Sequence, residues 1–541
     1  MRGLDPRNLL RWLPWLLGGA LLLVHGVEVV EWSHRNGIPD GHQNEFLHIG
    51  NALDLWGAFV DRDGWHLRYY LTTNYWPPGF YLAPWPLFAV MGPRHIAMVL
   101  TNLGHLAVLL AATYLLGVEL RGRWTGLAAM GLLTLYPSIY GNLVRFEPNV
   151  AVCAWVTLGA VFLVRSRGFS DRRAALMFGI AVALGLLMDR LSLGVFLALP
   201  AGVVWVSSIA RGDARKKLVG GLACLVVVAL IAGWWHVEFF THNLDELLSQ
   251  GGIGEVDSTG AWTEQRDAWA VESFLFYPAS LLDSQAGVVL GVLGLGGIAA
   301  ALAKPRGPRL VPLLIVLSAV GLFTLVQKKQ AFYTIPMLGC VAVLSAELLV
   351  RLGRPGVLVG AVMLFCGLHG HSRMMWDRGL ALPAVFENDA LPERYVAPRF
   401  PQALAPRGLR LPLESLSGAI PGGEVVVFSE DVAWFEGYVV LQLRERLPGQ
   451  KVRGLISDPR GVYEWFDTAQ GFVHVSTSRR GGAWPRESRM SEALEAHHYD
   501  LSDLPPVLST ITAAEQDFEQ VASWPLEHGG RVVLFRRTTG R

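Results

Sequence analysis

Acidic, amide and histidine side chains gather in one polar segment directly after the first long apolar stretch of the chain. Residues 40–48 read Asp-Gly-His-Gln-Asn-Glu-Phe-Leu-His. Glu45 and His48 are three positions apart, so on a helix they share one face. A carboxylate or an imidazole placed at a membrane surface can accept or donate a proton. The same spacing also fits a solvated amphipathic helix, so the pattern alone leaves a catalytic and a structural role open.

His42, Glu45 and His48 also have the donor types of a metal site, because neutral imidazole and carboxylate oxygen bind divalent ions. Their i, i+3, i+6 spacing spreads them around a helix, and no fourth ligand is evident. We therefore predict no metal-ligand set and no certain cofactor, and leave a divalent metal ion open.

A second block further along the same loop is rich in aromatic residues and proline. Residues 74–81 read Asn-Tyr-Trp-Pro-Pro-Gly-Phe-Tyr. Aromatic rings of this kind are typical of membrane–water interfaces. Tyr75, Trp76 and Tyr81 are therefore predicted to lie along a membrane interface.

The composition indicates a membrane protein. Of 541 residues, 52% are hydrophobic and 17% are charged, whereas soluble domains carry about 25% charged residues. The net charge of +1 gives no electrostatic basis for binding nucleic acid. The four cysteines lie inside apolar runs without paired spacing, which is typical of small core residues.

Eleven apolar segments approach the roughly 20 residues that a membrane-spanning helix needs. The first follows three arginines and is interpreted as an uncleaved signal anchor with a cytoplasmic N-terminus. If the chain alternates from there, every short loop rich in Arg and Lys falls on the cytoplasmic side, as the positive-inside rule requires. The segments are 12–30, 95–117, 125–141, 148–164, 174–188, 191–209, 218–236, 286–303, 310–326, 331–350 and 357–373.

This topology puts the loops 32–94 and 237–285 on the outer face. The stretch 79–92 is apolar, but its prolines disfavour a regular span. A span there would also invert every later loop. We therefore predict an interfacial or re-entrant segment at this place.

The last part of the chain changes in character. From residue 374 onward, charged residues and prolines recur, with strand-like runs at 424–429, 452–457, 471–477 and 531–536 and a helix-like run at 431–446. The sequence thus predicts a transmembrane domain over residues 1–373 and a small extracytoplasmic α/β domain over residues 374–541.

Two motifs of the first outer loop resemble the GT-C membrane glycosyltransferases, the superfamily of protein O-mannosyltransferases and lipid A aminoarabinose transferases. Members carry Asp-Glu-x-x-His or Asp-Glu-x-x-Tyr and then a Pro-Pro-Leu-Tyr-like block. Residues 44–48 and 76–81 occupy those places here. Further similar elements follow in the family's order at 145–148, 185–190, 233–235, 276–282 and 328–336.

The resemblance implies a polytopic GT-C-like fold. It also implies inverting transfer of a hexosyl or pentosyl group from a polyprenyl-phosphate donor to a lipid, glycan or protein acceptor. A carboxylate would orient or deprotonate the acceptor, and cations would stabilise the departing phosphate. The implied catalytic residues are Glu45, Glu147, Asn44 and Asp40, and the implied substrate-binding residues are His48, Tyr75, Trp76, Tyr81, Arg145, Arg190, Lys328, Lys329 and Tyr333.

These charged groups also have structural interpretations. Arg145 and Glu147 fit ordinary interfacial charges, and Asp189 with Arg190 fits a capped hairpin between two spans. The lysines at 328–329 fit helix-end side chains that reach toward water.

Asn44 departs from the resemblance, because the family commonly has Asp at this place and an amide does not accept a proton at neutral pH. Either Glu45 or Asp40 then supplies the acid, or the chain is inactive. A membrane transporter and a non-catalytic envelope-assembly protein are the alternatives. A bacterial inner membrane is the predicted location, with membrane lipids as partners and no nucleic acid.

Overall fold

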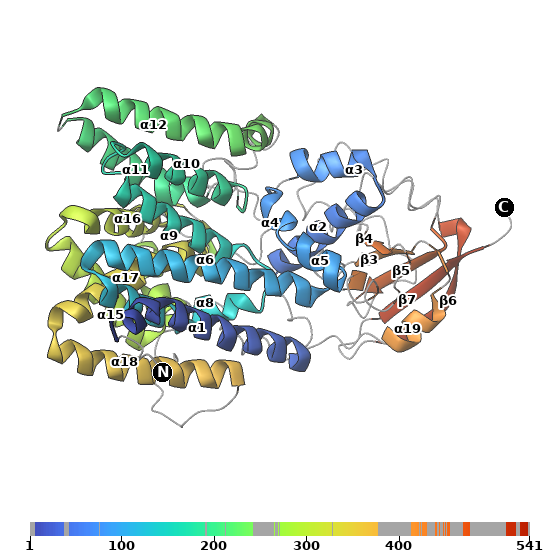
Figure 1. Cartoon of the computed structure of the whole chain (residues 1–541). Helices are drawn as coiled ribbons and strands as arrows, with labels where there is room; N and C mark the ends of the chain where they lie inside the picture. Colours follow the sequence, from blue (N-terminus) through green and yellow to red (C-terminus); the bar gives the residue numbers. More distant parts are fainter. Residues whose placement is uncertain are drawn as a thin grey trace, which may run out of the picture. The chain divides into compact units, whose positions relative to one another are not determined.

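A computed structural model gives the fold of this protein (Figure 1). The residues that it describes are 6–36, 43–74, 76–189, 192–210, 212–241, 264–265, 269, 271–326, 328–376, 413–420, 422–423, 425–429, 439–440, 443, 447, 450, 452–454, 469–476, 515–525 and 531–538.

The chain forms two compact units. The first, called here the helical unit, comprises Met1–Arg35, Asp63–Pro84 and Val99–Ala403, and the second comprises Asn36–Arg62, Trp85–Met98 and Leu404–Arg541. The second unit therefore takes two pieces of the first predicted outer loop together with the end of the chain. The predicted domain boundary near residue 373 stays a prediction.

Each of the eleven predicted spans coincides with helical residues. Six helices within the described residues are long and apolar enough to cross a membrane, and four more apolar helices are shorter. The protein is thus a mostly helical integral membrane protein. Its helices from α1 to α12 are α1 (Pro6–Asn36), α2 (Gln43–Val60), α3 (Gly64–Arg68), α4 (Gly79–Leu82), α5 (Trp85–Met91), α6 (His95–Arg121), α7 (Arg123–Thr134), α8 (Pro137–Leu143), α9 (Asn149–Arg165), α10 (Arg172–Leu186), α11 (Ser192–Ile209) and α12 (Ala214–Val228).

The later part of the helical unit alternates α-helices with short π-helical and 3₁₀-helical segments. They are η2 (Ala229–Gly233), α14 (Val271–Ser280), η3 (Leu281–Gln285), α15 (Val288–Leu302), η4 (Gly307–Arg309), α16 (Leu310–Leu325), η5 (Ala331–Met337), α17 (Leu338–Leu352), α18 (Arg354–Trp376) and the two-stranded pair β1 (Glu264–Gln265) and β2 (Lys328–Lys329).

Prolines set several of the helix boundaries. The predicted span 125–141 is two helices, because Pro137 begins α8 and its ring cannot continue α7. The proline-rich stretch 79–92 likewise forms two short helices, α4 and α5, with a break at Ala83 and Pro84. The predicted division of 174–209 is present as separate helices α10 and α11.

The helices of the helical unit pack through pairs that are distant in sequence. α7 lies against α17, α15 against α17, and α11 against α16 (Figure 1). Glycine allows close approach at one of these pairs, since a Cβ on Gly297 of α15 would lie 2.8 Å from the carbonyl oxygen of Leu344 of α17. Small residues at helix contacts are expected in a membrane, where close van der Waals packing drives association.

Four of the five basic loops of the helical unit meet at one end of its helices. Arg165 pairs with Glu119 at 2.8 Å and so joins the loop after α9 to the end of α6. Glu347 pairs with both Arg309 and Arg351 and joins the loops on either side of α16 and α17. Pro308 and Arg165 line one common pocket. These loops therefore share a side, as the positive-inside pattern requires.

The second unit contains a five-stranded mixed sheet. Its strand order is β4-β3-β5-β7-β6, with β3 parallel to β4 and β5, and β7 antiparallel to β5 and β6. Valine and leucine side chains from one face pack with the helix α19 (Leu413–Ala419). The strands are β3 (Val425–Ser429), β4 (Val452–Gly454), β5 (Gly471–Ser476), β6 (Phe518–Pro525) and β7 (Arg531–Arg537).

Four of these strands match the runs expected from the sequence, and β6 was missed. Its residues, Phe-Glu-Gln-Val-Ala-Ser-Trp-Pro, do not alternate strictly between apolar and polar, and Val521 is exposed. The helix predicted over 431–446 lies mostly outside the described residues. In the same unit, α2 packs on α5 through Trp56, whose ring lies 5.6 Å from the rings of both Trp85 and Phe88.

Candidate active site

A turn between α8 and α9 carries an arginine and a glutamate that are both buried in the helical unit. Arg145 is 8% exposed and Glu147 is 5% exposed. Arg145 Nη1 lies 3.9 Å from Glu147 Oε1, which is at the limit of an ion pair. Buried charges are costly unless they are paired or serve a ligand. The turn therefore places a cation and a carboxylate side by side in a protected position.

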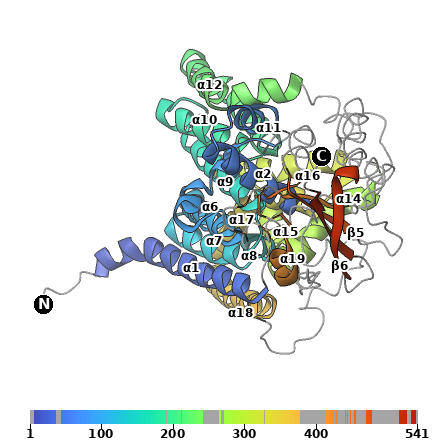
Figure 2. The ribbon, with the colours of Figure 1, turned by 90° about the vertical axis from the view of Figure 1, so that its right-hand side faces the viewer.

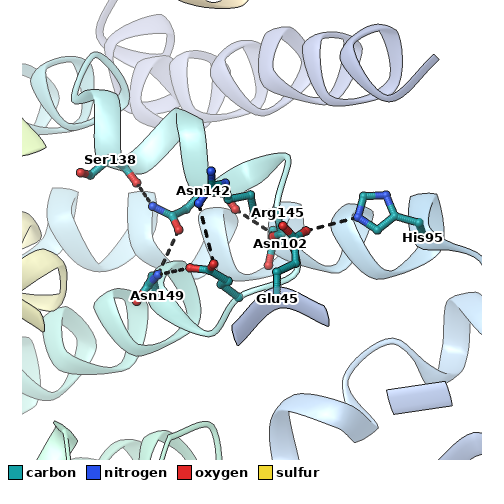
Figure 3. A network of polar contacts seen from close by, with 8 residues as sticks. Glu45, His95, Asn102, Ser138, Asn142, Arg145 and Asn149 are labelled. Carbon is teal, nitrogen blue, oxygen red and sulfur yellow. Dashed lines mark hydrogen bonds and ion pairs between the residues drawn. The ribbon is translucent and has the colours of Figure 1, made fainter. Parts of the chain in front are cut away.

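Asn102 of α6 holds this turn in place (Figure 3). Its Nδ2 donates to the carbonyl oxygens of Asn142 at 3.2 Å, Leu143 at 3.4 Å and Arg145 at 2.6 Å. These carbonyls lie where α8 ends and are left without partners in the helix. The amide thus fixes the backbone that carries Arg145.

Asn149, the first residue of α9, fixes the direction of the Glu147 carboxylate. Its Nδ2 donates to Glu147 Oε2 at 2.8 Å and to Asn142 Oδ1 at 3.0 Å (Figure 3). Glu147 also precedes the N-terminus of α9, whose backbone dipole favours a negative charge. The amide therefore fixes the position of the carboxylate beside the start of α9.

The aromatic block of the first outer loop packs directly against this turn. The ring of Phe80 stacks on that of Phe146, with centroids 4.4 Å apart. Gly79 lies on the end of α10, where an added Cβ would be 2.5 Å from the carbonyl oxygen of Leu187. Three motifs that are far apart in the sequence, 76–81, 145–148 and 185–190, therefore meet within the helical unit.

Two aromatic residues at the end of this block lie in the protein interior and not at a membrane–water interface. Phe80 is 1% exposed and Tyr81 is not exposed at all. Tyr81 is covered by protein, and its predicted contact with a substrate stays a prediction. Trp76 is only half-buried, and its backbone N–H donates to Asn74 Oδ1 at 3.3 Å.

The segment that carries the aromatic block begins with a capped helix. The Asp63 carboxylate accepts from the backbone N–H of His66 at 3.1 Å and lies 2.6 Å from its ring Nδ1. Burial raises the pKa of Asp63, but the hydrogen bonds from His66 and its charge outweigh burial and hold the pKa below its ordinary value. The cap anchors the loop at its start.

Lys329 is neither at a helix end in water nor snorkelling, because it lies in β2 and is 3% exposed. Its ammonium group donates to the carbonyl oxygens of Phe323, Thr324 and Val326 at the end of α16. Cations at this end of a helix stabilise the last carbonyls. A direct role of Lys329 on a phosphate stays a prediction.

Tyr333 belongs to a group of contacts that reaches back to α8. Its ring stacks on Phe323 with centroids 5.2 Å apart. Gln285 joins η5 to η3, since its Nε2 donates to the Ala331 carbonyl and to Thr334 Oγ1. The Ser138 hydroxyl then donates to the carbonyl of Ser284 at 3.0 Å. The motifs at 276–282 and 328–336 are thereby tied to the helix before the charged turn.

Glu45 and His48 lie on α2 in the second unit, and both side chains are buried. Glu45 Oε1 lies 3.4 Å from His95 Nε2 at the start of α6 (Figure 3). This burial contradicts a solvated amphipathic helix, because both polar groups face the interior. His95 was not predicted from the sequence.

Several predicted residues cannot be placed in this way. His42, Asp40, Tyr75 and Arg190 lie outside the described residues. The backbones of Asn44 and Lys328 are described, in α2 and β2, but their side chains are not.

Sequence reasoning also missed Asn102. The available signal was an amide in the middle of an apolar helix, a position where a polar side chain is costly and usually has a specific partner. With Asn102 added, the turn offers an anion-binding guanidinium beside an oriented carboxylate. Such an arrangement can bind a phosphate and accept a proton.

No protein-family model and no curated protein matches this chain. Among solved structures, ArnT from Cupriavidus metallidurans bound to undecaprenyl phosphate is 12% identical, with a TM-score of 0.52, over 96% of this chain and 98% of its own. The apo state of ArnT gives the same values. The apo oligosaccharyltransferase of Archaeoglobus fulgidus matches more weakly, with 10% identity and a TM-score of 0.44 over 94% of this chain and 73% of its own.

The chain thus shares the fold of ArnT, which agrees with the polytopic helical fold expected from the resemblance. The likeness at this level of identity concerns the fold. The activity has to be argued from the residues of this chain.

Proposed function

We propose that this protein is a membrane glycosyltransferase that moves a sugar from a polyprenyl-phosphate donor to a lipid, glycan or protein acceptor. The shared fold supports this class, since the ArnT structure contains undecaprenyl phosphate. The observation that carries the proposal is the meeting of motifs 76–81 and 145–148 around a buried Arg145 and Glu147.

The proposed reaction is a single displacement with inversion at the anomeric carbon. The acceptor hydroxyl attacks this carbon and forms the new C–O bond, while the bond to the lipid phosphate breaks and its electron pair leaves with the phosphate. Glu147 accepts the proton of the hydroxyl, with Glu45 as the second candidate acid. Arg145 stabilises the negative charge that develops on the phosphate.

The proposed site faces outward in a bacterial inner membrane. Its support is the charge distribution of the helical unit, where four basic loops lie together at one end of the helices. The Arg145 turn precedes α9, and Arg165 of the basic end terminates the same helix. The positive-inside rule then assigns the turn to the outer face.

The test is sugar transfer by the full chain in a deletion strain, followed by mass spectrometry of glycolipids and glycoproteins. Wild type is expected to restore a lost glycan. Glu147→Gln is expected to lower transfer by about 100-fold or more, because the amide keeps the shape but accepts no proton. Glu45→Gln is measured beside it and identifies which carboxylate is the base.

Full transfer by both glutamine variants and their double variant would remove the assigned base. Unchanged glycans between the deletion strain and wild type would favour a non-catalytic assembly protein or a transporter. The first of these alternatives has a specific basis in Asn44, which stands where the family commonly has an acid.

A further inference from the structure

A second polar cluster of the helical unit lies apart from the charged turn, between the first and the last long helices. α1 and α18 lie side by side in both views (Figures 1 and 2). His25 and Glu28 of α1 and His371 of α18 are 3%, 4% and 8% exposed. All three lie inside helices that can cross a membrane, or at the end of one.

The three side chains converge on one point. Glu28 Oε2 lies 2.9 Å from His25 Nδ1 and 3.2 Å from His371 Nε2. One ligand atom from each residue lies within 4.8 Å of the other two. His25 and Glu28 are three positions apart on one helix face, and His371 comes from the facing helix.

The separations are compatible with a metal ion as well as with hydrogen bonds to Glu28. Two donor atoms at about 2.1 Å from a tetrahedral zinc ion lie about 3.4 Å apart. The 3.2 Å contact from His371 Nε2 to Glu28 Oε2 is near this value, whereas the 2.9 Å contact from His25 Nδ1 is a hydrogen bond that a bound ion would lengthen. The rings of the two histidines are nearly perpendicular, at 79°, with centroids 5.5 Å apart.

Tyr140 supports the orientation of one ligand. Its ring meets that of His371 at 85° with centroids 4.6 Å apart. An aromatic ring packed on the imidazole restricts its rotation, and ligands held in this way lose less entropy when a metal binds.

We propose that His25, Glu28 and His371 form a zinc-binding site that fastens α1 to α18. Two imidazoles and one carboxylate are a ligand set that zinc accepts, with a fourth position left for water. The cation also balances a carboxylate that is costly at membrane depth. This inference is independent of the proposed glycosyl transfer.

The test measures metal content in the full-length protein purified with a tag that contains no histidine. The protein is stripped with a chelator, loaded with zinc chloride, desalted and analysed by mass spectrometry of the metal. Wild type is expected to retain about one zinc per chain. Glu28→Gln, His25→Ala and His371→Ala are each expected to lose it.

The matched controls are Glu31→Gln and His34→Ala, which change exposed residues of the same helix and are expected to keep the zinc. Cobalt loading gives a second readout, since tetrahedral Co²⁺ with nitrogen and oxygen ligands absorbs visible light, and His371→Ala is expected to lose this band. Zinc should also raise the Tm of wild type and leave that of the three site variants unchanged.

Wild-type protein that retains no zinc would overturn the inference whether or not the variants fold. His25, Glu28 and His371 would then be a hydrogen-bonded cluster without a metal. Equal zinc in wild type and in all three site variants would overturn it as well. Neither result depends on sugar transfer, so the proposed function can fail or hold separately.

Discussion

The two ends of helix α9 carry similar charges in different settings. At its C-terminal end, Arg165 and Glu119 form a 2.8 Å pair in which the side chains are 36% and 31% exposed. At its N-terminal end, Arg145 and Glu147 are 3.9 Å apart and about one-tenth exposed or less. α9 has 17 residues, which separates the two ends by about 26 Å.

The two pairs differ in their neighbours. Side-chain amides position the pair at the N-terminal end, whereas the pair at the C-terminal end consists of the two charged groups. Asn102 and Asn149 hold the backbone and the carboxylate of the N-terminal pair, and the glutamate does not close on the arginine. In the described part of the chain, the Nε–H of Arg165 donates to the carboxylate of Glu119 and not to an amide oxygen. The exposed pair at short distance, Arg165 and Glu119, adds little to the free energy of unfolding. The buried pair, Arg145 and Glu147, is held apart by amides and is therefore suited to binding a ligand.

The largest expected effect comes from Arg145→Ala. Sugar transfer should fall by about 100-fold or more, because a fixed cation no longer stabilises the leaving phosphate. Arg145→Lys should recover only part of it, since an ammonium group lacks the planar fork. Rates are measured on purified protein. Arg165→Ala, the matched change at the other end of α9, should leave transfer unchanged. Equal losses of transfer in both variants would contradict the different roles assigned to the two pairs.

Next in size is Glu347→Gln, which probes a buried pair at the basic end. Glu347 is 2% exposed and binds two arginines. Its loss leaves both guanidinium groups without their carboxylate and should lower the free energy of unfolding by about 2 kcal/mol. Thermal unfolding in detergent measures this. Transfer per folded molecule should stay at the wild-type level, and a loss there would mean that the basic end also serves catalysis.

Asn102→Ala should have a smaller effect, which should appear both in the free energy of unfolding and in the rate of sugar transfer. The turn carbonyls lose their donor, which lowers the free energy of unfolding by about 1 kcal/mol. Since Asn102 positions Arg145, kcat should fall while the KM of the acceptor changes less. Asn102→Asp, which has no side-chain N–H and turns carboxylate oxygens toward the same carbonyls, should be more destabilising than Ala. If kcat stays normal while stability falls, the amide is structural only.

The smallest effect is expected for Glu119→Gln. The pair with Arg165 is about one-third exposed on both sides, so its loss should change the free energy of unfolding by no more than about 0.5 kcal/mol. The effect should shrink further in high salt. A destabilisation as large as that of Glu347→Gln would show that exposure does not separate the two kinds of pair.

Much of the fold could be predicted from the sequence. Apolar length locates the helices, because a spanning helix satisfies its own backbone hydrogen bonds and needs only apolar side chains. Four strands of the last part were found from their β-branched runs, which fit a half-buried sheet surface. The clustering of Arg and Lys on alternate loops gave a topology that agrees with the loops joined through Arg165 and Glu347.

The site could be predicted only in part. The charges of Arg145 and Glu147 stand out in the sequence, but their distance depends on Asn102, which lies 43 positions before Arg145. The same holds for His371, which meets Glu28 from the other end of the chain. Partners of this kind are set by helix packing and leave no local pattern.

The sequence by itself determined that the chain is a membrane protein, which segments are helical and which polar residues are unusual for their place. These properties follow from transfer free energy and backbone geometry, which act on neighbouring residues. Only the tertiary structure decided which unusual residues meet. It buried Phe80 and Tyr81 against the charged turn, engaged Lys329 with backbone carbonyls and brought His25, Glu28 and His371 together, because contacts between helices depend on the packing of the whole unit.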